Sequence, residues 1–328
     1  MTPPRLRIGV AGAGHFGRYH ALKVAASGRA TLSGVHDTHA ERAKTVGWEA
    51  GAPDLPFDAL LAASDAVVIA TPARTHHALA AAALRAGKHV LVEKPIASTL
   101  AQADELAALA EQRGLVLQVG HLERFSAAHG ALVGRIGAPL YLEATRIAPF
   151  KPRGTDVSVI LDLMIHDLDL VLALVDSPIE SVDAVGAAVA SPHEDIANAH
   201  IRFSSGAVAT ITASRIAART ERRMRIFAQD GYVAVDFANR RLTVIARGTG
   251  TGQPVPGVEG FGLEEVSWEE HDSLAAEHAA FIAAVQDGAP VLVDAPAGRR
   301  ALAAALAVTE AMAESRARMT ASGLIAGG

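Results

Sequence analysis

Three acidic residues and a histidine stand in an otherwise apolar stretch, SVILDLMIHDLDLVL (158–172). Asp162, His166 and Asp169 are spaced i, i+4 and i+7, so on an α-helix they share one face, whereas Asp167 lies about 100° away. Ionisable groups are costly in an apolar helix unless they are paired, hydrated or used. Histidine has an ordinary pKa of ~6.5 and is a competent base at neutral pH. The spacing therefore places candidate acid–base groups on one face, and a hydrogen-bonded His–Asp pair at the surface or in the core is the alternative.

Two alternatives accompany this prediction. Asp167 and Asp169 are equally compatible with structural ion pairs or with charges on a solvated helix face. Histidine and carboxylates also bind zinc, but the chain has no cysteine and hence no thiolate ligand. We expect no metal centre.

A glycine-rich motif near the N-terminus predicts a nucleotide site. Gly12, Gly14 and Gly17 form G-x-G-x-x-G between the strand-like RLRIGVAG and the helix-like HFGRYHALKVAAS. In this context the first glycine permits a tight turn, the second a close approach of a pyrophosphate, and the third close helix–strand packing. The helix N-terminus at His15 and Phe16 supplies unpaired N–H groups and a positive dipole end. The alternative is that the glycines only form turns.

Asp37 closes the next strand-like segment, ATLSGVHD, 20 positions after Gly17. A carboxylate at this place accepts hydrogen bonds from ribose hydroxyls and repels a 2′-phosphate, so we expect NAD rather than NADP. The alternative role is that of a helix cap. Two further strand ends, ATPARTHH (70–77) and VEKP (92–95), should face the cofactor, because ligands bind at the carboxyl ends of parallel strands.

The order of predicted elements changes near residue 121. Before it, strands and helices alternate, which predicts an α/β fold with a doubly wound parallel sheet of the Rossmann type. After it, strand candidates follow one another and predict an α+β domain with a mostly antiparallel sheet. We therefore divide the chain into domains 1–121 and 122–328, with a loop over 247–262 and helices from Asp272 onward. The strand candidates are SVDAVGAAVA, IANAHIRFSS, GAVATITASRI, ERRMRIFAQ, GYVAVDFA and RRLTVIAR.

Bulk composition narrows the function classes. A chain of 328 residues suits two domains, and 50% hydrophobic with 20% charged residues is typical of globular proteins. The formal net charge of -5 and the lack of a long basic run argue against nucleic acid or a membrane surface as partner. An apolar run of the ~18 residues needed for a membrane span is missing. The absence of cysteine excludes disulfides and fits a cytoplasmic location.

Taken in order, these motifs resemble the Gfo/Idh/MocA oxidoreductase family over nearly the whole chain. The resemblance begins with GVAGAGHFG (9–17) and continues with the Thr-Pro and the following histidine of ATPARTHH. Its most recognisable short signature is EKP (93–95), and Asp162-x-x-x-His166 falls where the family places its catalytic Asp and His. In one departure, SVIL (158–161) precedes this aspartate where many members carry a glycine run, which leaves the substrate pose open.

The resemblance implies a Rossmann dinucleotide-binding domain at 1–121. The domain at 122–328 is then a substrate-binding and oligomerisation domain with a large open sheet that makes homodimer or homotetramer contacts. Hydride transfer between a carbohydrate carbinol and NAD is the implied activity, with a cis peptide before Pro95. The implied catalytic residues are Lys94, Asp162 and His166. The implied cofactor-binding residues are Gly12, Gly14, His15, Phe16, Gly17, Asp37, Thr71, Pro72, His76, Glu93 and Lys94; for His76, packing at the helix start is the alternative.

A closer similarity is to a nucleotide-sugar branch of the family. It rests on VGHLERF (119–125), DLMIHDLDL (162–170) and ASRIAARTERRMRIFAQDGYVAVDF (213–237). It implies oxidation of the C3 hydroxyl of UDP-N-acetylglucosamine to the 3-keto sugar, with an aminotransferase as a downstream partner. A diphosphate needs cationic or N–H partners. The candidate substrate residues are His121, Arg124, Lys151, Arg153 and Asp169, with the arginines of 215–225; a domain-junction ion pair at Arg124 and a solvated arginine face are the alternatives.

Several assignments stay open from the sequence. His166 is our candidate for the base, with Lys94 polarising the hydroxyl; the reverse assignment requires burial and cationic neighbours to lower the pKa of Lys94. Asp162 either bonds the sugar or orients the imidazole. The alternative functions are an inositol or free-sugar dehydrogenase and a non-catalytic NAD-binding sensor. The joint presence of all three candidate catalytic residues argues against the sensor.

Overall fold

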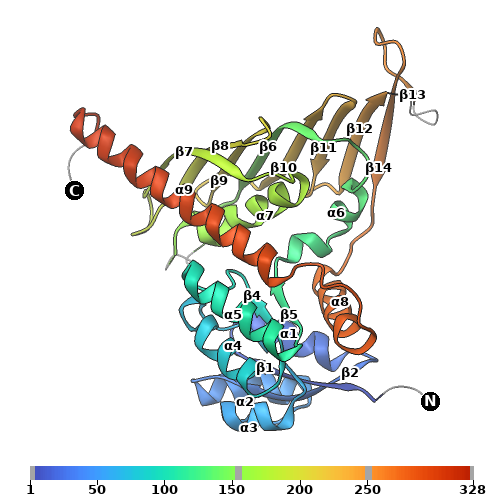
Figure 1. Cartoon of the computed structure of the whole chain (residues 1–328), viewed down its shortest axis with the longest axis vertical. Coiled ribbons are helices and arrows are strands. Elements are labelled where there is room, and N and C mark those ends of the chain that lie inside the picture. Colours follow the sequence, from blue (N-terminus) through green and yellow to red (C-terminus); the bar gives the residue numbers. More distant parts are fainter. Residues whose placement is uncertain (1–3, 152–156, 248–252, 326–328) are drawn as a thin grey trace. The chain divides into compact units, whose positions relative to one another are not determined.

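The computed structural model describes residues 4–151, 157–247 and 253–325. The chain forms two compact units, shown in Figure 1. The first comprises residues 1–125 and 272–302, and the second comprises residues 126–271 and 303–328. Among the described residues, none of the helices combines the length and apolar character needed to cross a membrane.

The first unit is built on a five-stranded sheet in the order β2-β1-β3-β4-β5. Every neighbouring pair in it is parallel. All residues of the central strand β3 are buried, as expected for an apolar run covered on both faces. The strands are β1 (Leu6–Ala11), β2 (Ala30–His36), β3 (Ala66–Ile69), β4 (His89–Glu93) and β5 (Leu117–Gly120). The helices are α1 (His15–Ala25), α2 (Ala40–Ala50), α3 (Phe57–Ala63), α4 (His76–Arg85), α5 (Leu100–Arg113) and α8 (Ser273–Asp287).

Helix α8 brings a late part of the chain back to this first unit. Phe281 and Ile282 of α8 join the apolar core formed by residues of β1, α1 and β2. Beyond α8, Val293 O accepts a hydrogen bond of 2.9 Å from Val119 N of β5. The predicted boundary at residue 121 lies close to the end of the first segment at 125, but the prediction placed 272–302 in the second domain. Local pattern gave no signal for this return, because it depends on contacts with distant residues.

The second unit contains a nine-stranded sheet in the order β13-β14-β12-β11-β10-β6-β9-β8-β7. Among the strand pairs of the described residues, only β6–β9 is parallel. The predicted fold class is therefore confirmed. Helix α7 lies against one face of the sheet (Figure 1). The strands are β6 (Pro139–Ile147), β7 (Ile179–Ala187), β8 (Ile196–Phe203), β9 (Val208–Ser214), β10 (Glu221–Ala228), β11 (Gly231–Asp236), β12 (Arg241–Arg247), β13 (Gln253–Pro254) and β14 (Phe261–Ser267). The remaining helices are α6 (Ala127–Leu132), α7 (Ile165–Leu174) and α9 (Ala295–Ala321).

The strand predictions in this unit were largely right, with two omissions. Six predicted segments correspond to β7 through β12. Strand β6 was not predicted, although it lies within the sheet between β10 and β9. The expected loop at 247–262 contains β13 and the start of β14. Its glycines and prolines suggested a loop, but β14 pairs with β12 and β13 pairs with β14.

Candidate active site

The glycine turn of the first unit has the geometry that a dinucleotide needs. Gly12 has φ +101°, and an added Cβ would lie 2.4 Å from Ala70 O. At Gly17 an added Cβ would lie 1.8 Å from Gly12 O, so this position requires a glycine for packing. An added Cβ at Gly14, by contrast, would have no atom of another described segment within 4 Å. The second glycine therefore leaves open space beside the backbone, as close approach of a pyrophosphate requires.

Helix α1 begins at this open glycine. Gly14 is its N-cap, and within the described part of the chain no side chain caps this end. The first turn also lacks acidic residues, while His15 and Phe16 are exposed. The unpaired N–H groups and the positive dipole end are thus available to an anion.

Asp37 ties the glycine turn to the end of β2. Its Oδ2 accepts a hydrogen bond of 2.7 Å from Ala13 N, and its Oδ1 accepts one of 2.8 Å from His39 N. A carboxylate offers about four lone-pair sites, so two backbone bonds leave capacity for ribose hydroxyls. The structure thus adds an anchoring role to the predicted cofactor role of Asp37.

His76 joins the two predicted strand ends that follow β3 and β4. The side chain is buried, with Nδ1 2.7 Å from Pro95 O and Nε2 2.8 Å from Thr71 O. Carbonyl oxygens only accept, so both bonds form together in the imidazolium form. The Lys94–Pro95 peptide is cis, as the family resemblance implied.

Glu93 anchors the backbone at the predicted catalytic lysine. Its Oε1 accepts a hydrogen bond of 2.9 Å from His20 Nε2, and its Oε2 accepts one of 3.2 Å from Lys94 N. Burial alone would disfavour ionisation of Glu93. The hydrogen bond and the charge of His20, together with the positive charges of Lys94 and His76, outweigh this and hold the pKa of Glu93 below its ordinary value. Lys94 is partly exposed.

The predicted cofactor residues of this unit therefore gather at one edge of its sheet. Each group follows the carboxyl end of a parallel strand, which is where ligands bind in such sheets. In chain order these positions are Gly12 after β1, Asp37 after β2, Thr71 and Pro72 after β3, and Glu93 and Lys94 at the end of β4. His121, a candidate substrate residue, follows β5.

In the second unit, Asp162 lies in a π-helical turn. This turn spans Ile160–Met164 and leads directly into α7, so the prediction of an α-helix throughout was wrong for its first turn. Single π turns with i→i+5 hydrogen bonds are frequent at functional sites. Asp162 and His166 are both partly exposed, whereas Asp169 is buried.

Asp167 has a structural role. Its two oxygens accept hydrogen bonds of 2.7 Å from Arg146 Nε and 2.9 Å from a terminal nitrogen of Arg146. Both side chains are buried, and Arg146 belongs to β6. This bidentate pair links α7 to the sheet. Sequence analysis had left the structural pair as one of two possibilities for Asp167 and had not identified Arg146.

A second buried ion pair, between Asp195 and Arg215, was missed. Asp195 accepts hydrogen bonds from the N–H groups of Val189, Ala190 and Ser191 at 2.8, 2.6 and 3.0 Å. Arg215 Nε donates to Asp195 at 2.8 Å, and Arg215 also donates to Val157 O at 2.9 Å. Burial disfavours the charge, but Arg215 and the backbone donors hold the pKa of Asp195 well below its ordinary value.

Two further arginines that were predicted as diphosphate partners form ion pairs within the sheet. Arg225 Nε lies 3.4 Å from a carboxyl oxygen of Glu143, and Arg223 Nε lies 3.4 Å from one of Asp236. Their positions in β10 fit the alternative of a solvated strand face. Of the remaining candidates, His121 is buried, Arg124 is partly buried and Lys151 is exposed, while Arg153 lies outside the described residues.

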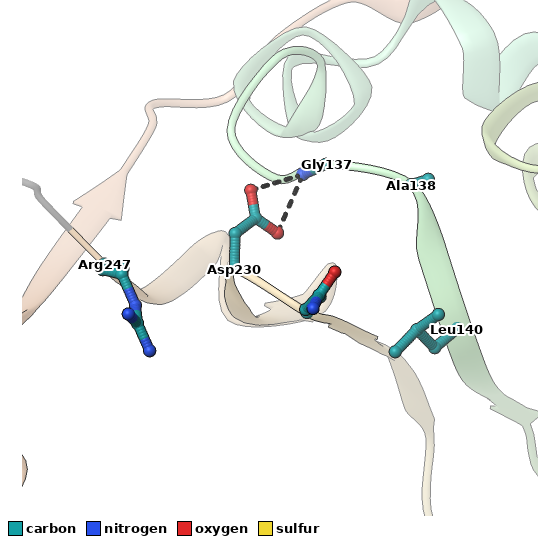
Figure 2. A pocket seen from close by; sticks show the side chains of 6 residues that line it. Gly137, Ala138, Leu140, Asp230 and Arg247 are labelled. Atoms are coloured by element: carbon teal, nitrogen blue, oxygen red, sulfur yellow. Dashed lines mark hydrogen bonds between the residues drawn. The ribbon is translucent and has the colours of Figure 1, made fainter.

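A pocket in the second unit lies apart from these residues. It has a volume of about 480 Å³ and is lined by Gly137, Ala138, Leu140, Gln229, Asp230 and Arg247. Figure 2 shows Asp230 accepting the Gly137 N–H with both oxygens, at 3.1 and 3.2 Å. None of the predicted catalytic or cofactor residues lines this pocket, so we do not assign it to catalysis.

Comparison with known proteins identifies relatives across both units. The model of the Gfo/Idh/MocA oxidoreductase family, NAD-binding Rossmann fold, matches residues 6–121, and that of the family's C-terminal domain matches residues 132–234. UDP-N-acetylglucosamine 3-dehydrogenase of Acidithiobacillus ferrooxidans is 48% identical over 94% of this chain and 97% of its own length. A solved structure of that dehydrogenase has a TM-score of 0.87, at 47% identity, covering 94% of this chain and 98% of its own.

Inositol 2-dehydrogenase of Rhizobium meliloti is a more distant relative. It is 30% identical over 95% of this chain and 98% of its own length. The relatives are thus dehydrogenases, and the family model that covers the glycine turn is one of NAD binding. The chain belongs to the Gfo/Idh/MocA family of oxidoreductases, as its motifs predicted.

Proposed function

We propose that this protein is an NAD-dependent dehydrogenase that oxidises the C3 hydroxyl of UDP-N-acetylglucosamine to the 3-keto sugar. The observation that carries the proposal is 48% identity, over nearly the full length of both chains, with a UDP-N-acetylglucosamine 3-dehydrogenase. Identity with the inositol 2-dehydrogenase of Rhizobium meliloti is 30%. A cytoplasmic location, a homodimer or homotetramer and a downstream aminotransferase remain predictions.

The residues of the first unit fit NAD. Gly14 leaves space for the pyrophosphate, the uncapped end of α1 supplies N–H donors, and Asp37 keeps lone pairs for ribose hydroxyls. The others that would hold NAD are His15, Phe16, Thr71, Pro72, His76, Glu93 and Lys94. NAD, when bound, supplies the acceptor for the hydride that leaves the sugar carbon.

The residues of this chain have to manage the hydroxyl proton. As the hydride leaves C3, the oxygen must lose its proton, and a base within hydrogen-bond reach removes it. His166 is the base in this proposal, and the Lys94 ammonium donates a hydrogen bond to the same oxygen as negative charge develops there. Asp162 orients the sugar or the imidazole. The hydrogen bond from Lys94 N to Glu93 fixes the backbone from which the ammonium projects.

The first experiment mixes purified protein with NAD and UDP-N-acetylglucosamine and follows NADH absorbance. Parallel reactions contain NADP, free N-acetylglucosamine or myo-inositol. Added 2-oxoglutarate and mass spectrometry detect a recycled cofactor. NADH, or a nucleotide sugar two mass units lighter, formed only from the UDP-sugar supports the proposal, and NMR then identifies the oxidised carbon.

The other outcomes separate the alternatives. Activity on myo-inositol alone would support a dehydrogenase of this family and contradict UDP-N-acetylglucosamine as the substrate. If no substrate is oxidised although NAD still binds, the result would favour an untested sugar substrate or a non-catalytic NAD-binding sensor.

Substitutions test the two catalytic assignments separately. His166→Ala should lower kcat by about 10²- to 10⁴-fold, the usual contribution of a general base. Lys94→Ala should also lower kcat, and Lys94→Arg, which keeps the charge, should recover part of the loss. Unchanged turnover in His166→Ala would contradict our assignment and favour Lys94 as the base.

A matched pair of glycine variants tests the cofactor site. Gly14→Val should weaken NAD binding without lowering the melting temperature, since among the described residues the added Cβ meets no atom of another segment within 4 Å. Gly28 has equally open surroundings but lies outside the motif, so Gly28→Val should change neither property. Equal NAD affinities in the two variants, by isothermal titration calorimetry, would contradict the predicted site.

A further inference from the structure

A buried polar cluster in the first unit adjoins the segment that carries Lys94. It consists of His20 from α1, Glu93 from the end of β4, Glu277 and His278 from α8, and Gln118 from β5. All except Glu93 are buried, and the Glu93 side chain is 16% exposed. The sequence motifs drew attention to Glu93 alone.

Hydrogen bonds connect the two histidines to Glu93. The Glu93 carboxylate only accepts, so His20 Nε2 carries a hydrogen and donates it across 2.9 Å. His20 Nδ1 and His278 Nε2 form a second hydrogen bond, also at 2.9 Å. Burial, followed by the influence of His20, lowers the pKa of His278 well below its ordinary value, which keeps this imidazole neutral. The result is a continuous hydrogen-bonded chain from His278 through His20 to Glu93.

Glu277 stands beside this chain without a hydrogen bond to its carboxyl group. Its exposed fraction is 0%, and neither of its carboxyl oxygens has a hydrogen-bond partner among the described residues. Its backbone is held by Gln118, whose Nε2 donates to Glu277 O at 3.2 Å. An ionised carboxylate in this position would have lost its hydration without gaining a hydrogen bond that replaces it.

Burial raises the pKa of Glu277 well above its ordinary value, and the negative charge of Glu93 raises it further. A carboxyl oxygen of each glutamate and a ring nitrogen of His20 lie within 4.8 Å of one another. Two carboxyl groups this close in a low-dielectric site hold one proton between them.

We propose that Glu277 is a positioning residue: as a neutral acid it holds the Glu93 carboxylate, and through Glu93 the backbone at Lys94. A small movement of the Glu277 side chain brings its O–H onto that carboxylate. Glu93 then accepts from His20, from Glu277 and from Lys94 N. Gly120 leaves room for this arrangement, because a Cβ there would lie 3.1 Å from Glu93 Cα and Cδ.

The same three side chains have a spacing that would suit a divalent cation. The direct bond between His20 and Glu93 favours a proton instead. A metal ion bound by His20 would occupy the Nε2 lone pair, whereas this nitrogen carries the hydrogen donated to Glu93.

The pH dependence of stability tests the protonation state. A carboxyl whose pKa is raised by folding stabilises the protein fully below its unfolded-state pKa of ~4.3, and this stabilisation is lost as pH rises. Glu277→Gln has no proton to lose, so its melting temperature should rise relative to wild type between about pH 5 and about pH 8. Ala279→Gln, at an exposed position of the same helix, should follow wild type. A flat or falling difference for Glu277→Gln would overturn the proposal.

The groups around Glu277 also titrate, so they enter the comparison. Glu93, His20 and His278 are in the cluster; Lys94 and His76 act on Glu93, and Lys23 and Asp272 act on His278. These groups are present in both wild type and Glu277→Gln. The difference between the two proteins therefore isolates the proton of Glu277 and its coupling to Glu93.

Kinetics test the positioning role, and this part rests on the proposed function. Glu277→Gln keeps a donor toward Glu93 and should retain kcat. Glu277→Leu removes the donor and should lower kcat by about 10- to 100-fold, as small misplacements of reacting groups do, with the KM for UDP-N-acetylglucosamine nearly unchanged. Equal losses in both variants would overturn the proposal. If wild type does not oxidise the sugar, the proposed function fails, and the stability comparison still decides the state of Glu277.

Metal analysis excludes or establishes the competing explanation. The protein, incubated with Zn²⁺ or Mn²⁺ and then desalted, should contain far less than one equivalent of either by mass spectrometry. One equivalent of metal bound to wild type but not to Glu277→Gln would overturn the proposal and show that the cluster is a metal site. Neither this measurement nor the stability comparison requires Glu277→Leu to fold.

Discussion

Two fully buried carboxyl groups, one in each unit, have opposite surroundings. Asp195 accepts hydrogen bonds from three backbone N–H groups, from the Ser191 hydroxyl and from Arg215. Glu277 accepts none with its carboxyl oxygens among the described residues, and its nearest ionised neighbour is another carboxylate. Both side chains have 0% exposure, yet the pKa of Asp195 is lowered and that of Glu277 is raised.

The difference shows that burial alone does not decide charge. Burial opposes ionisation of both groups, and it is the largest single influence on each. At Asp195 the donors reverse it, while at Glu277 the charge of Glu93 adds to it. In our proposal Glu277 acts on Lys94 through Glu93, which accepts a hydrogen bond from Lys94 N. The Asp195 network bonds Val157 O through Arg215.

The largest expected effect comes from breaking the charged network. Asp195→Ala leaves Arg215 buried without its counterion and should lower the free energy of unfolding by about 3–5 kcal/mol. Chemical denaturation measures the loss. Asp287→Ala breaks the exposed pair with Arg29 and is the matched control, which should leave the free energy of unfolding close to that of wild type. Equal losses would show that the Asp195 network contributes no more than a surface pair.

A smaller effect is expected in acid. Because the pKa of Asp195 is lowered in the folded state, its charge stabilises the protein above the unfolded-state pKa of ~3.9, and this is lost as pH falls further. Asp195→Asn should therefore be about 2–3 kcal/mol less stable than wild type near neutral pH. The gap should narrow below about pH 4. A gap that stays constant to low pH would contradict a charged Asp195.

His278, which belongs to the cluster around Glu277, offers a further test. His278→Leu removes the hydrogen-bond partner of His20 Nδ1 and should lower the free energy of unfolding by about 1–2 kcal/mol at neutral pH. The pKa of His278 is lowered, so wild type loses stability as pH falls below the unfolded-state value of ~6.5. The variant lacks this loss, and its deficit should shrink toward about pH 5. Thermal melts at several pH values measure it, and a growing deficit would indicate a charged His278.

The smallest effect is expected at Gln118. Gln118→Leu removes one hydrogen bond to Glu277 O, but it also removes an amide oxygen that has no partner among the described residues. The two changes largely offset each other, so the free energy of unfolding should fall by less than about 1 kcal/mol. A loss as large as that of Asp195→Ala would mean that the hydrogen bonds around Glu277 contribute as much stability as those around Asp195.

Features that depend on local pattern could be predicted from the sequence. The glycine spacing after an apolar strand and before a helix was sufficient to predict the turn at Gly12, Gly14 and Gly17 and the parallel sheet that contains it. Strand periodicity likewise predicted β7 through β12. These features need only residues that are close along the chain, where turn chemistry and side-chain period act directly.

Which distant residues share an environment became visible in the folded chain alone. Gln118 and Glu277 are 159 positions apart, and His20 and His278 are 258 apart, so no local pattern relates them. The motif around Asp162 and His166 was visible in the sequence, but its π turn, the Arg146–Asp167 pair and the Asp195 network were not. The charge of a buried group depends on the donors and charges that packing brings to it, and packing is not encoded in any one segment.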